Sequence, residues 1–299
     1  MRERMAELGE KMMRDFMPEQ HRTFFAQLPF VIVGSVDAEG QPWASILANP
    51  PGFISSPDER RLLIRARPPV TDPLPATLTT GSSIALLGIE QHTRRRNRMN
   101  GFVERVGEDG ILIGVQQSFG NCPKYIQARK AEYINTESIG TVHSATTLNA
   151  FTRQIVARAD TLFIATTHPG SRHTTARSHG VDVSHRGGKP GFVRVDGGNT
   201  LTLPDFSGNR FFNTLGNILL NPRAGLLFVD FATGDMLTIT ADAEIIFAGP
   251  EVDAYTGAER LLKFSLHSIR HAVASLPLRW SGAAELSPFL ENTGQWITT

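Results

Sequence analysis

The chain has 299 residues, of which 40% are hydrophobic and 20% are charged, and its formal net charge is +1. These values are typical of a soluble globular protein of one large or two ordinary domains, and they give no general attraction to nucleic acid or to a membrane surface. No stretch approaches the ~20 apolar residues of a membrane span, and the first residues lack the apolar core of a signal peptide. The single cysteine, Cys122, excludes an internal disulfide and fits a reducing compartment. We therefore expect a cytoplasmic protein.

The first half of the chain combines one helical pattern with a series of short β patterns. Apolar residues at helical spacing predict an amphipathic helix over residues 2–16, which Pro18 stops. Alternating apolar runs separated by turn residues then predict strands. These runs are Phe30–Val36, Pro42–Ala48, Arg61–Ala66, Ser83–Ile89, Asn100–Val106 and Gly110–Val115. The sequence thus predicts a β-rich first half with a leading helix.

An arginine-rich run, Thr93–Arg98, interrupts these strands with the sequence TRRRNR. A nucleic-acid patch would have aromatic residues interleaved and a basic excess elsewhere, and neither is present. The run is therefore interpreted as a solvated turn, or as an anchor for an anionic ligand across a domain contact. The thiol of Cys122 has no partner at a recognisable spacing, so we expect it to be passive.

A polar, irregular stretch, residues 128–148, is interpreted as the connection between two domains, with the boundary between residues 142 and 143. A helix over Asn149–Ala159 and a strand over Asp160–Thr166 follow it. The next loop contains His168, His173 and His179. Their spacing does not place them on one helix face and no second thiolate accompanies them, so we predict a polar loop and no metal site.

The second half is organised around residues 181–231. Two apolar runs, Gly191–Val195 and Thr200–Pro204, flank a glycine pair and predict a hairpin. Ser207 is a good N-cap for a helix with Phe211, Leu215, Ile218 and Leu219 on one face, and Asn221-Pro222 ends that helix. The remaining predicted elements are strands over Ala224–Phe231 and Met236–Phe247, a helix over Glu251–Phe264, a closing strand over Ser268–Trp280, and a tail with Pro288 and Trp296 that packs on the surface or on a partner.

Polar residues gather at and along the start of the predicted helix, away from its apolar face. They are Asn209, Arg210, Asn213, Thr214 and Asn217. The free N–H groups and positive dipole end of a helix start favour an anion, and a guanidinium and a hydroxyl would strengthen a phosphate site. Ordinary capping with a solvated face is the alternative.

Three motifs in this half carry a family resemblance: SHRGGKPGFV from Ser184, NTLGN from Asn213 and NPRAGLLF from Asn221. In this order they resemble the pyridoxamine 5′-phosphate oxidase-like split-barrel flavoproteins, in particular their long members. The resemblance covers the second half well and the first half loosely. It implies a mainly β fold with flanking helices (α+β), built as two tandem FMN-binding split β-barrels: a domain at residues 1–142 with the leading helix, and a domain at residues 143–299 with the flavin phosphate site.

The resemblance also implies where FMN would bind. In the oxidase, an arginine and a lysine seven and eight residues before the Asn-Pro turn hold the FMN phosphate. This sequence has Asn213 and Thr214 there, so Arg210 would have to supply the charge. The implied contacts are Asn209, Arg210, Asn213, Thr214 and Asn217 at the phosphate, Ser184, Arg186, Gly187 and Gly188 near the ring or ribityl chain, Lys189 at either, and Gln117 with Ser118 from the other barrel.

The two halves repeat a similar order of strands, so we expect a tandem duplication in which only the second half keeps the phosphate-binding helix. The implied function is an FMN-dependent oxidoreductase that acts on a small-molecule substrate or with a redox partner. His185 is the only candidate acid–base residue, and a structural role suits it better. A flavin carrier, or a degenerate barrel that binds heme or no cofactor, are the alternatives. We expect a homodimer, and neither nucleic acid nor membrane as a partner.

Overall fold

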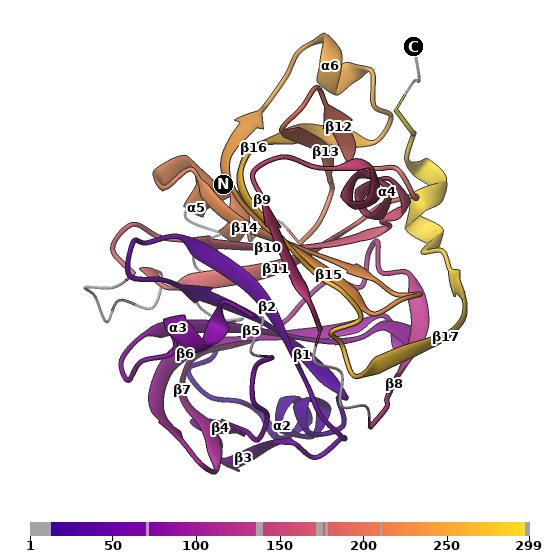
Figure 1. Ribbon diagram of the computed structural model, residues 1–299. Coiled ribbons are helices and arrows are strands. Elements are labelled where there is room, and N and C mark those ends of the chain that lie inside the picture. The colour runs from indigo at the N-terminus through magenta and orange to yellow at the C-terminus, as the bar shows by residue number, and fades with distance from the viewer. Residues whose placement is uncertain are drawn as a thin grey trace.

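The computed structural model describes residues 13–69, 72–135, 140–171, 176, 179–209 and 211–296. The fold is mainly antiparallel β, with short helices at its periphery, as the sequence predicts. Two large sheets each curl around an apolar core, and they lie one above the other in Figure 1. Among the described residues, no helix is long and apolar enough to cross a membrane.

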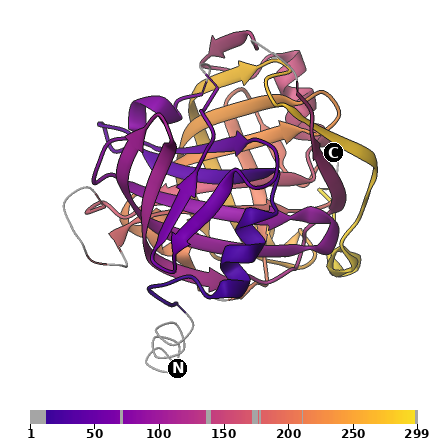
Figure 2. The ribbon, with the colours of Figure 1, turned by 90° about the horizontal axis from the view of Figure 1, so that it is seen from below.

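The N-terminal barrel is a seven-stranded sheet with the order β2-β1-β5-β6-β7-β4-β3. It lies in front of the second sheet in Figure 2. Its elements are α2 (Glu19–Ala26), β1 (Phe30–Val36), β2 (Pro42–Ala48), β3 (Ile54–Asp58), β4 (Arg61–Ile64), α3 (Leu74–Thr77), β5 (Ser83–Glu90), η1 (Gln91–Thr93), β6 (Arg95–Gly107) and β7 (Gly110–Gly120).

The C-terminal barrel repeats this arrangement with the order β11-β10-β14-β15-β16-β13-β12. Its elements are α4 (Ala150–Arg158), β10 (Thr161–Thr167), β11 (Val181–Gly187), β12 (Arg194–Asp196), β13 (Thr200–Phe206), α5 (Asn213–Leu220), β14 (Arg223–Asp230), β15 (Asp235–Ile246), α6 (Pro250–Asp253), β16 (Ala258–Ala272) and η3 (Pro288–Asn292). Strand for strand, the two orders are the same. Each barrel also has a helix before its first strand and one before its fifth.

The leading helix differs from the prediction. Most of it, residues 1–12, lies outside the described residues. Residues 13–16 are not helical, because the backbone of Arg14 pairs with that of Ser118 at the edge of β7. The helix of this region, α2, instead begins directly after Pro18. Proline lacks a backbone N–H, but at a helix start this group has no partner within the helix, so no hydrogen bond is lost.

The connection between the halves is more regular than predicted. Residues 128–148 contain β8 (Ala128–Tyr133), which pairs with β17 (Leu278–Glu285), and β9 (Val142–Ala145), which pairs with β16. The β8–β17 ribbon is partly exposed and carries many polar side chains, so it lacks the apolar alternation that predicts a strand.

The predicted helix over Glu251–Phe264 is wrong, because α6 ends at Asp253 and β16 begins at Ala258. Gly257, with φ at +85°, lies between them and adopts a left-handed backbone conformation that does not continue the helix. Strand β16 pairs with β15 and β13, and its buried Leu262, Phe264 and Leu266 alternate with more exposed residues. The adjacent buried Leu261 interrupts this alternation within the range predicted as a helix. The predicted closing strand, Ser268–Trp280, covers the end of β16 and the start of β17.

A third apolar cluster joins the two barrels. It is formed by alternate residues of β1, β2 and β5 on one side and of β10, β11 and β14 on the other. Within β1, for example, Val31 and Val33 point into their own barrel, whereas Ile32 points to the other barrel. The central members of the cluster are Phe30, Ile32, Ala44, Ile46, Leu87, Phe163, Ala165, Val183 and Leu227, all at most 3% exposed. The barrels therefore share one continuous apolar interface.

Candidate functional site

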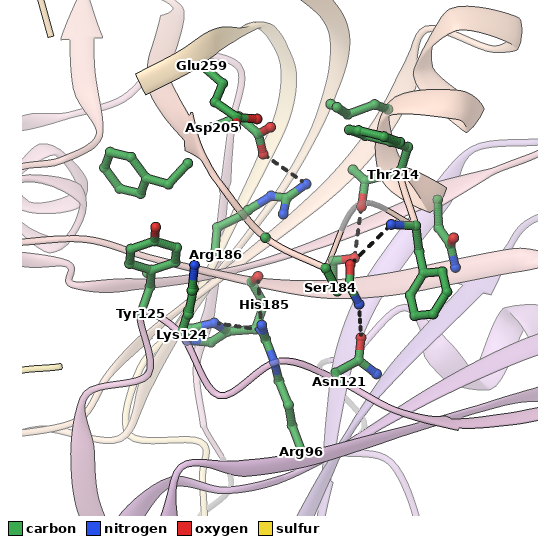
Figure 3. Close-up of a pocket in the computed structure, with 18 of the residues that line it drawn as sticks. Arg96, Asn121, Lys124, Tyr125, Ser184, His185, Arg186, Asp205, Thr214 and Glu259 are labelled. Atoms are coloured by element: carbon green, nitrogen blue, oxygen red, sulfur yellow. Dashed lines mark hydrogen bonds and ion pairs between the residues drawn. The ribbon is translucent and has the colours of Figure 1, made fainter. Parts of the chain in front are cut away.

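A pocket opens beside this interface, next to the start of α5, and it draws side chains from both barrels (Figure 3). We call it the inter-barrel pocket. From the N-terminal barrel and the segment after it come Arg96, Arg98, Asn121, Lys124 and Tyr125. From the C-terminal barrel come Ser184, His185, Arg186, Gly187, Pro204, Asp205, Phe206, Gly208, Asn209, Phe211, Phe212, Asn213, Thr214, Leu215, Glu259 and Arg260.

Two non-glycine residues with left-handed backbone line this pocket. Phe212, the residue before α5, has φ at +55°, and Tyr125 has φ at +64°. Such conformations cost about 1–3 kcal/mol and gather at functional sites. The turn at Phe212 places the start of α5 at Asn213, six residues after the predicted N-cap, Ser207. Within α5, Leu215 and Ile218 are buried, whereas Leu219 is 64% exposed and does not lie on the buried face.

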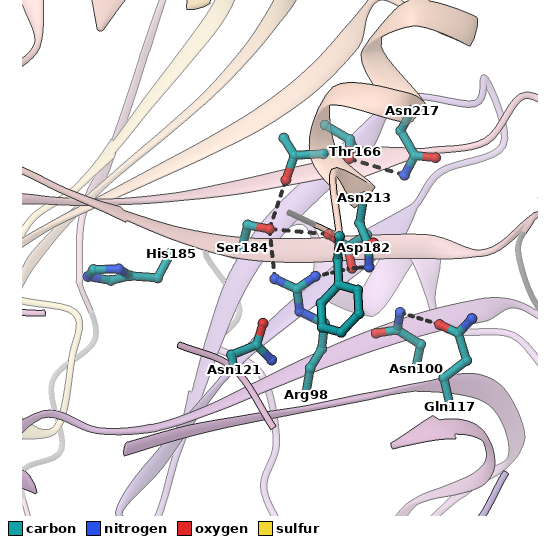
Figure 4. A network of polar contacts seen from close by, with 12 residues as sticks. Arg98, Asn100, Gln117, Asn121, Thr166, Asp182, Ser184, His185, Asn213 and Asn217 are labelled. Carbon is teal, nitrogen blue, oxygen red and sulfur yellow. Dashed lines mark hydrogen bonds and ion pairs between the residues drawn. The ribbon is translucent and has the colours of Figure 1, made fainter. Parts of the chain in front are cut away.

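A buried network fixes the start of α5 to both barrels (Figure 4). The Arg98 guanidinium donates from Nη1 to Asp182 Oδ1 at 2.7 Å and from Nη2 to Ser184 Oγ at 2.8 Å. The Ser184 and Thr214 hydroxyls are also hydrogen-bonded, at 2.8 Å. Arg98 lies on β6, Ser184 on β11 and Thr214 on α5. The network therefore joins one strand of the N-terminal barrel to a strand and a helix of the C-terminal barrel.

A second arginine of β6, Arg96, has no carboxylate partner among the described residues. Its Nε donates to the carbonyl oxygen of Cys122 at 2.6 Å, and its Nη1 donates to Nδ1 of His185 at 3.2 Å. Burial, and next the charge of Arg98, lower the pKa of Arg96 to about 9. An arginine in this state is a cation without a counterion.

The imidazole of His185 is neutral. Burial, and next the charge of Arg96, hold the pKa of His185 well below its usual value. Because an arginine can only donate, Nδ1 of His185 accepts and its proton lies on Nε2. The histidine therefore orients Arg96, as the structural role expected from the sequence requires.

The remaining basic side chains are partly neutralised. Asp205 pairs with Arg186 at 3.3 Å and with Arg260 at 2.8 Å, and Glu259 also pairs with Arg260. The Lys124 ammonium lies 5.2 Å from the centre of the Phe289 ring, and no described carboxylate pairs with it. Five basic side chains and two carboxylates, Asp205 and Glu259, line the described pocket, and Asp182 neutralises Arg98 from outside the lining. Together these groups leave a formal charge of +2.

Several residues named from the sequence meet in this pocket: Ser184, Arg186, Gly187, Asn209, Asn213 and Thr214. Arg210 lies outside the described residues. The two glycines serve chain packing, since a Cβ at Gly187 would overlap the carbonyl oxygen of Tyr125 and one at Gly188 would overlap the ring of Phe192.

Gly188 and four other named residues do not line the inter-barrel pocket. Lys189 donates to the carbonyl oxygen of Thr293 at 2.6 Å and so holds the tail on the C-terminal barrel. Asn217 donates to Thr166 Oγ1, and Gln117 accepts from Asn100. Ser118 is buried inside the N-terminal barrel and bonded to His21 at 2.8 Å.

The pocket residues that sequence reasoning missed come mainly from the first half: Arg96, Arg98, Asn121, Lys124 and Tyr125. For the arginine run, the sequence leaves open a solvated turn or an anchor for an anionic ligand across a domain contact, without assigning single arginines. Only Arg94, with φ at +55°, lies in the turn, and Arg95 to Arg98 begin β6. On a strand, Arg96 and Arg98 share one face, which is the face of the pocket.

Metal chemistry receives no support from the described residues, which include no group of three or more histidine, cysteine or acidic side chains. His168 and His179 stack with ring centres 3.8 Å apart, and His173 lies outside the described residues.

Comparison with known proteins shows a similarity to one family in the first half of the chain. Residues 17–142 match the family model described as pyridoxamine 5′-phosphate oxidase. This match lies in the first half, whereas the motifs noted in the sequence lie mainly in the second half. No curated protein matches the sequence.

Three solved structures are similar to about two fifths of the chain. A histidine-to-alanine variant of HupZ from Group A Streptococcus is 14% identical and covers 41% of this chain and 98% of its own, with a TM-score of 0.32. A putative pyridoxamine 5′-phosphate oxidase from Lactobacillus delbrueckii is 11% identical over 42% and 94%, with a TM-score of 0.32. An FMN-binding protein from Syntrophomonas wolfei is 11% identical over 39% and 79%, with a TM-score of 0.28. Residues 17–142 are thus similar to the pyridoxamine 5′-phosphate oxidase family, and over this part of the chain the predicted resemblance is confirmed.

Proposed function

We propose that the protein is an FMN-binding flavoprotein of the oxidoreductase type and that the inter-barrel pocket holds the flavin. The observation that carries this proposal is the formal charge of +2 beside the start of α5, which matches a phosphate monoester of about −1.5 to −2. Three buried nitrogens that line the pocket have no described hydrogen-bond partner: Arg98 Nε, Asn121 Nδ2 and Arg186 Nε. These unpaired donors also fit an anionic, oxygen-rich ligand.

The lining residues suggest a division of roles. Asn209, Asn213 and Thr214 would lie at the phosphate with Arg96, and the role expected of Arg210, which lies outside the described residues, stays a prediction. Ser184 and Arg186 would contact the ribityl chain. The aromatic side chains of Tyr125, Phe206, Phe211 and Phe212 offer apolar surface for a flat ring.

When bound, FMN would supply the hydride or electron transfer, and the chain would supply binding and orientation. Neither His185 nor Tyr125, the two described lining residues considered as proton donors or acceptors, suits proton transfer near neutral pH. His185 is neutral and engaged with Arg96, and burial raises the pKa of Tyr125 above its usual value. This favours a flavin carrier or redox-partner module as the second candidate.

The first test is the absorbance spectrum of the purified protein, followed by identification of the released chromophore. We expect a flavin spectrum and FMN rather than FAD, because the pocket gathers one cluster of phosphate-binding groups. A colourless protein that leaves the fluorescence of added FMN unchanged would contradict the proposal. Reduction of the bound flavin by NADH or NADPH would favour an enzyme, and no reduction would favour a carrier.

We also propose that residues 1–142 and 143–299 are two domains derived from a tandem duplication, with a homodimer as the assembled form. The identical strand order of the two barrels supports the duplication. Light scattering tests the dimer, which a mass near 32.8 kDa would contradict.

A further inference from the structure

The start of α5 contributes polar groups but no positive charge. Its sequence, NTLGNILL, has no basic residue. The Thr214 hydroxyl and the Asn213 amide can bond to a phosphate, yet a buried dianion also needs cations. The cations of the C-terminal barrel that line the pocket, Arg186 and Arg260, already share Asp205.

The unpaired cations of the pocket come from the other half of the chain. Arg98 is neutralised by Asp182, whereas no described carboxylate pairs with Arg96 or Lys124. Figure 3 shows Arg96 extending from β6 towards His185 and into the pocket. The segment after β7 brings Lys124 to the same pocket.

The orientation of Arg96 is set before any ligand arrives. Its Nε is bound to the Cys122 carbonyl oxygen and its Nη1 to His185 Nδ1. A guanidinium is planar, so fixing two nitrogens also fixes the direction of the third. Among the described residues, Nη2 has no hydrogen-bond partner. An arginine preorganised in this way loses little entropy when it binds an oxyanion.

We infer that Arg96, assisted by Lys124, is the phosphate-binding cation of this chain, so that the N-terminal barrel supplies the charge for a phosphate monoester bound at α5 of the C-terminal barrel. The inference rests on the proposed function, because it places the phosphate of a flavin in the inter-barrel pocket. It also specifies the ligand class, since riboflavin has no phosphate for Arg96 to bind.

The experiment compares the affinities of FMN and riboflavin by fluorescence titration in the full-length wild-type protein and in Arg96→Gln. We expect the substitution to weaken FMN about 30- to 100-fold, the loss of a charge-assisted hydrogen bond, and to change riboflavin affinity less than about threefold. The matched control is Arg95→Gln, the adjacent exposed residue, whose guanidinium lies over Phe24. It should leave both affinities unchanged.

A second variant and a second probe keep the test decisive. Circular dichroism checks folding, and if Arg96→Gln does not fold, Lys124→Gln should still weaken FMN several-fold and riboflavin hardly at all. Inorganic phosphate should raise the melting temperature of the wild type but not that of a folded Arg96→Gln or Lys124→Gln variant.

The outcomes separate the inference from the proposed function. Equal losses for FMN and riboflavin, or no loss for either, would overturn the role of Arg96. A wild-type protein that binds neither flavin, yet is stabilised by phosphate through Arg96, would refute the flavin function and support the anion site.

Discussion

Asp72 is the clearest case of a buried group whose charge state should govern stability. Its side chain is 7% exposed, and Oδ1 accepts from Ser45 Oγ at 2.6 Å and from the Leu74 N–H at 2.8 Å. Burial raises the pKa of Asp72 from 3.8 to about 6, against the opposing effect of these hydrogen bonds. Because the folded pKa exceeds the unfolded one, the native state binds the proton more tightly. This contribution to stability is present below pH 4 and is lost as the pH rises through 6.

The variant Asp72→Asn keeps an acceptor for Ser45 and cannot ionise. Its free energy of unfolding, relative to that of the wild type, should increase by up to about 3 kcal/mol between pH 4 and pH 7.5. Urea unfolding at both pH values measures this difference. Asp109→Asn is the control, because Arg105 lowers the pKa of that exposed carboxyl; its titration lies below pH 4, so its difference from the wild type should hardly change between pH 4 and pH 7.5. A difference for Asp72→Asn that does not vary with pH would contradict the prediction.

At the residue scale, the sequence predicted the part of the candidate site that is local in the chain. Ser184, Asn213 and Thr214 lie in recognisable motifs and meet in one pocket. Arg96 and His185 are 89 positions apart, and their contact depends on how the two barrels dock. No periodicity in the sequence specifies that docking, so the cations of the pocket could not be assigned.

At the element scale, the short apolar runs of β1, β2 and β5, which are buried on both faces, were predicted almost residue by residue. Two kinds of element were missed, each for a physical reason. Strands of the exposed β8–β17 ribbon lack apolar alternation, and in β16 the adjacent buried Leu261 and Leu262 interrupt the alternation where the helix was predicted. The start of α5 depends on the left-handed turn at Phe212, for which the sequence offers no glycine or asparagine.

Strand β11 depends on a glycine at its end. Gly187 lies against the carbonyl oxygen of Tyr125, and a Cβ there would overlap that backbone atom, which cannot move as a flexible side chain can. Gly187→Ala should therefore destabilise the fold by about 1–3 kcal/mol, the usual cost of overpacking. The matched control is Gly216→Ala in α5, where a Cβ meets nothing within 4 Å and alanine should stabilise the protein by about 0.5–1 kcal/mol. Urea unfolding of both variants checks the two signs, and a Gly187→Ala variant as stable as the wild type would show that the close contact is not required.

At the scale of the whole molecule, the two barrels have the same strand order. If their roles are exchanged, a second position in the molecule therefore corresponds to the inter-barrel pocket. Ser45 is the central residue of β2 and pairs with the central residue of β1, as Ser184 does in β11 with β10. Ser184 bonds to Thr214 at the start of α5, whereas Ser45 bonds to Asp72, which lies just before the four-residue helix α3. The equivalent position therefore has a carboxyl group where the pocket has a hydroxyl.

Strand β15 is the counterpart of β6 in the C-terminal barrel, and it has no cation at the positions that correspond to Arg96 and Arg98. Arg98 pairs with Leu87, the fifth residue of β5, and Thr238 pairs with Leu227, the fifth residue of β14. By the same register, Met236 of β15 takes the position of Arg96. A phosphate at the second position would meet a carboxyl group without the two arginines that surround the first.

We therefore expect the chain to bind one FMN and not two. One site per chain follows from the asymmetry of Arg96 and Arg98 against Met236 and Thr238, although the two barrels share a single fold. Isothermal titration of the flavin-free protein with FMN, with the protein concentration fixed by amino-acid analysis, should give a stoichiometry of about one per chain. A value of two would mean that the carboxyl group of Asp72 does not exclude phosphate. A value of one half would mean that two chains complete one site, which conflicts with a pocket built from both barrels of the same chain.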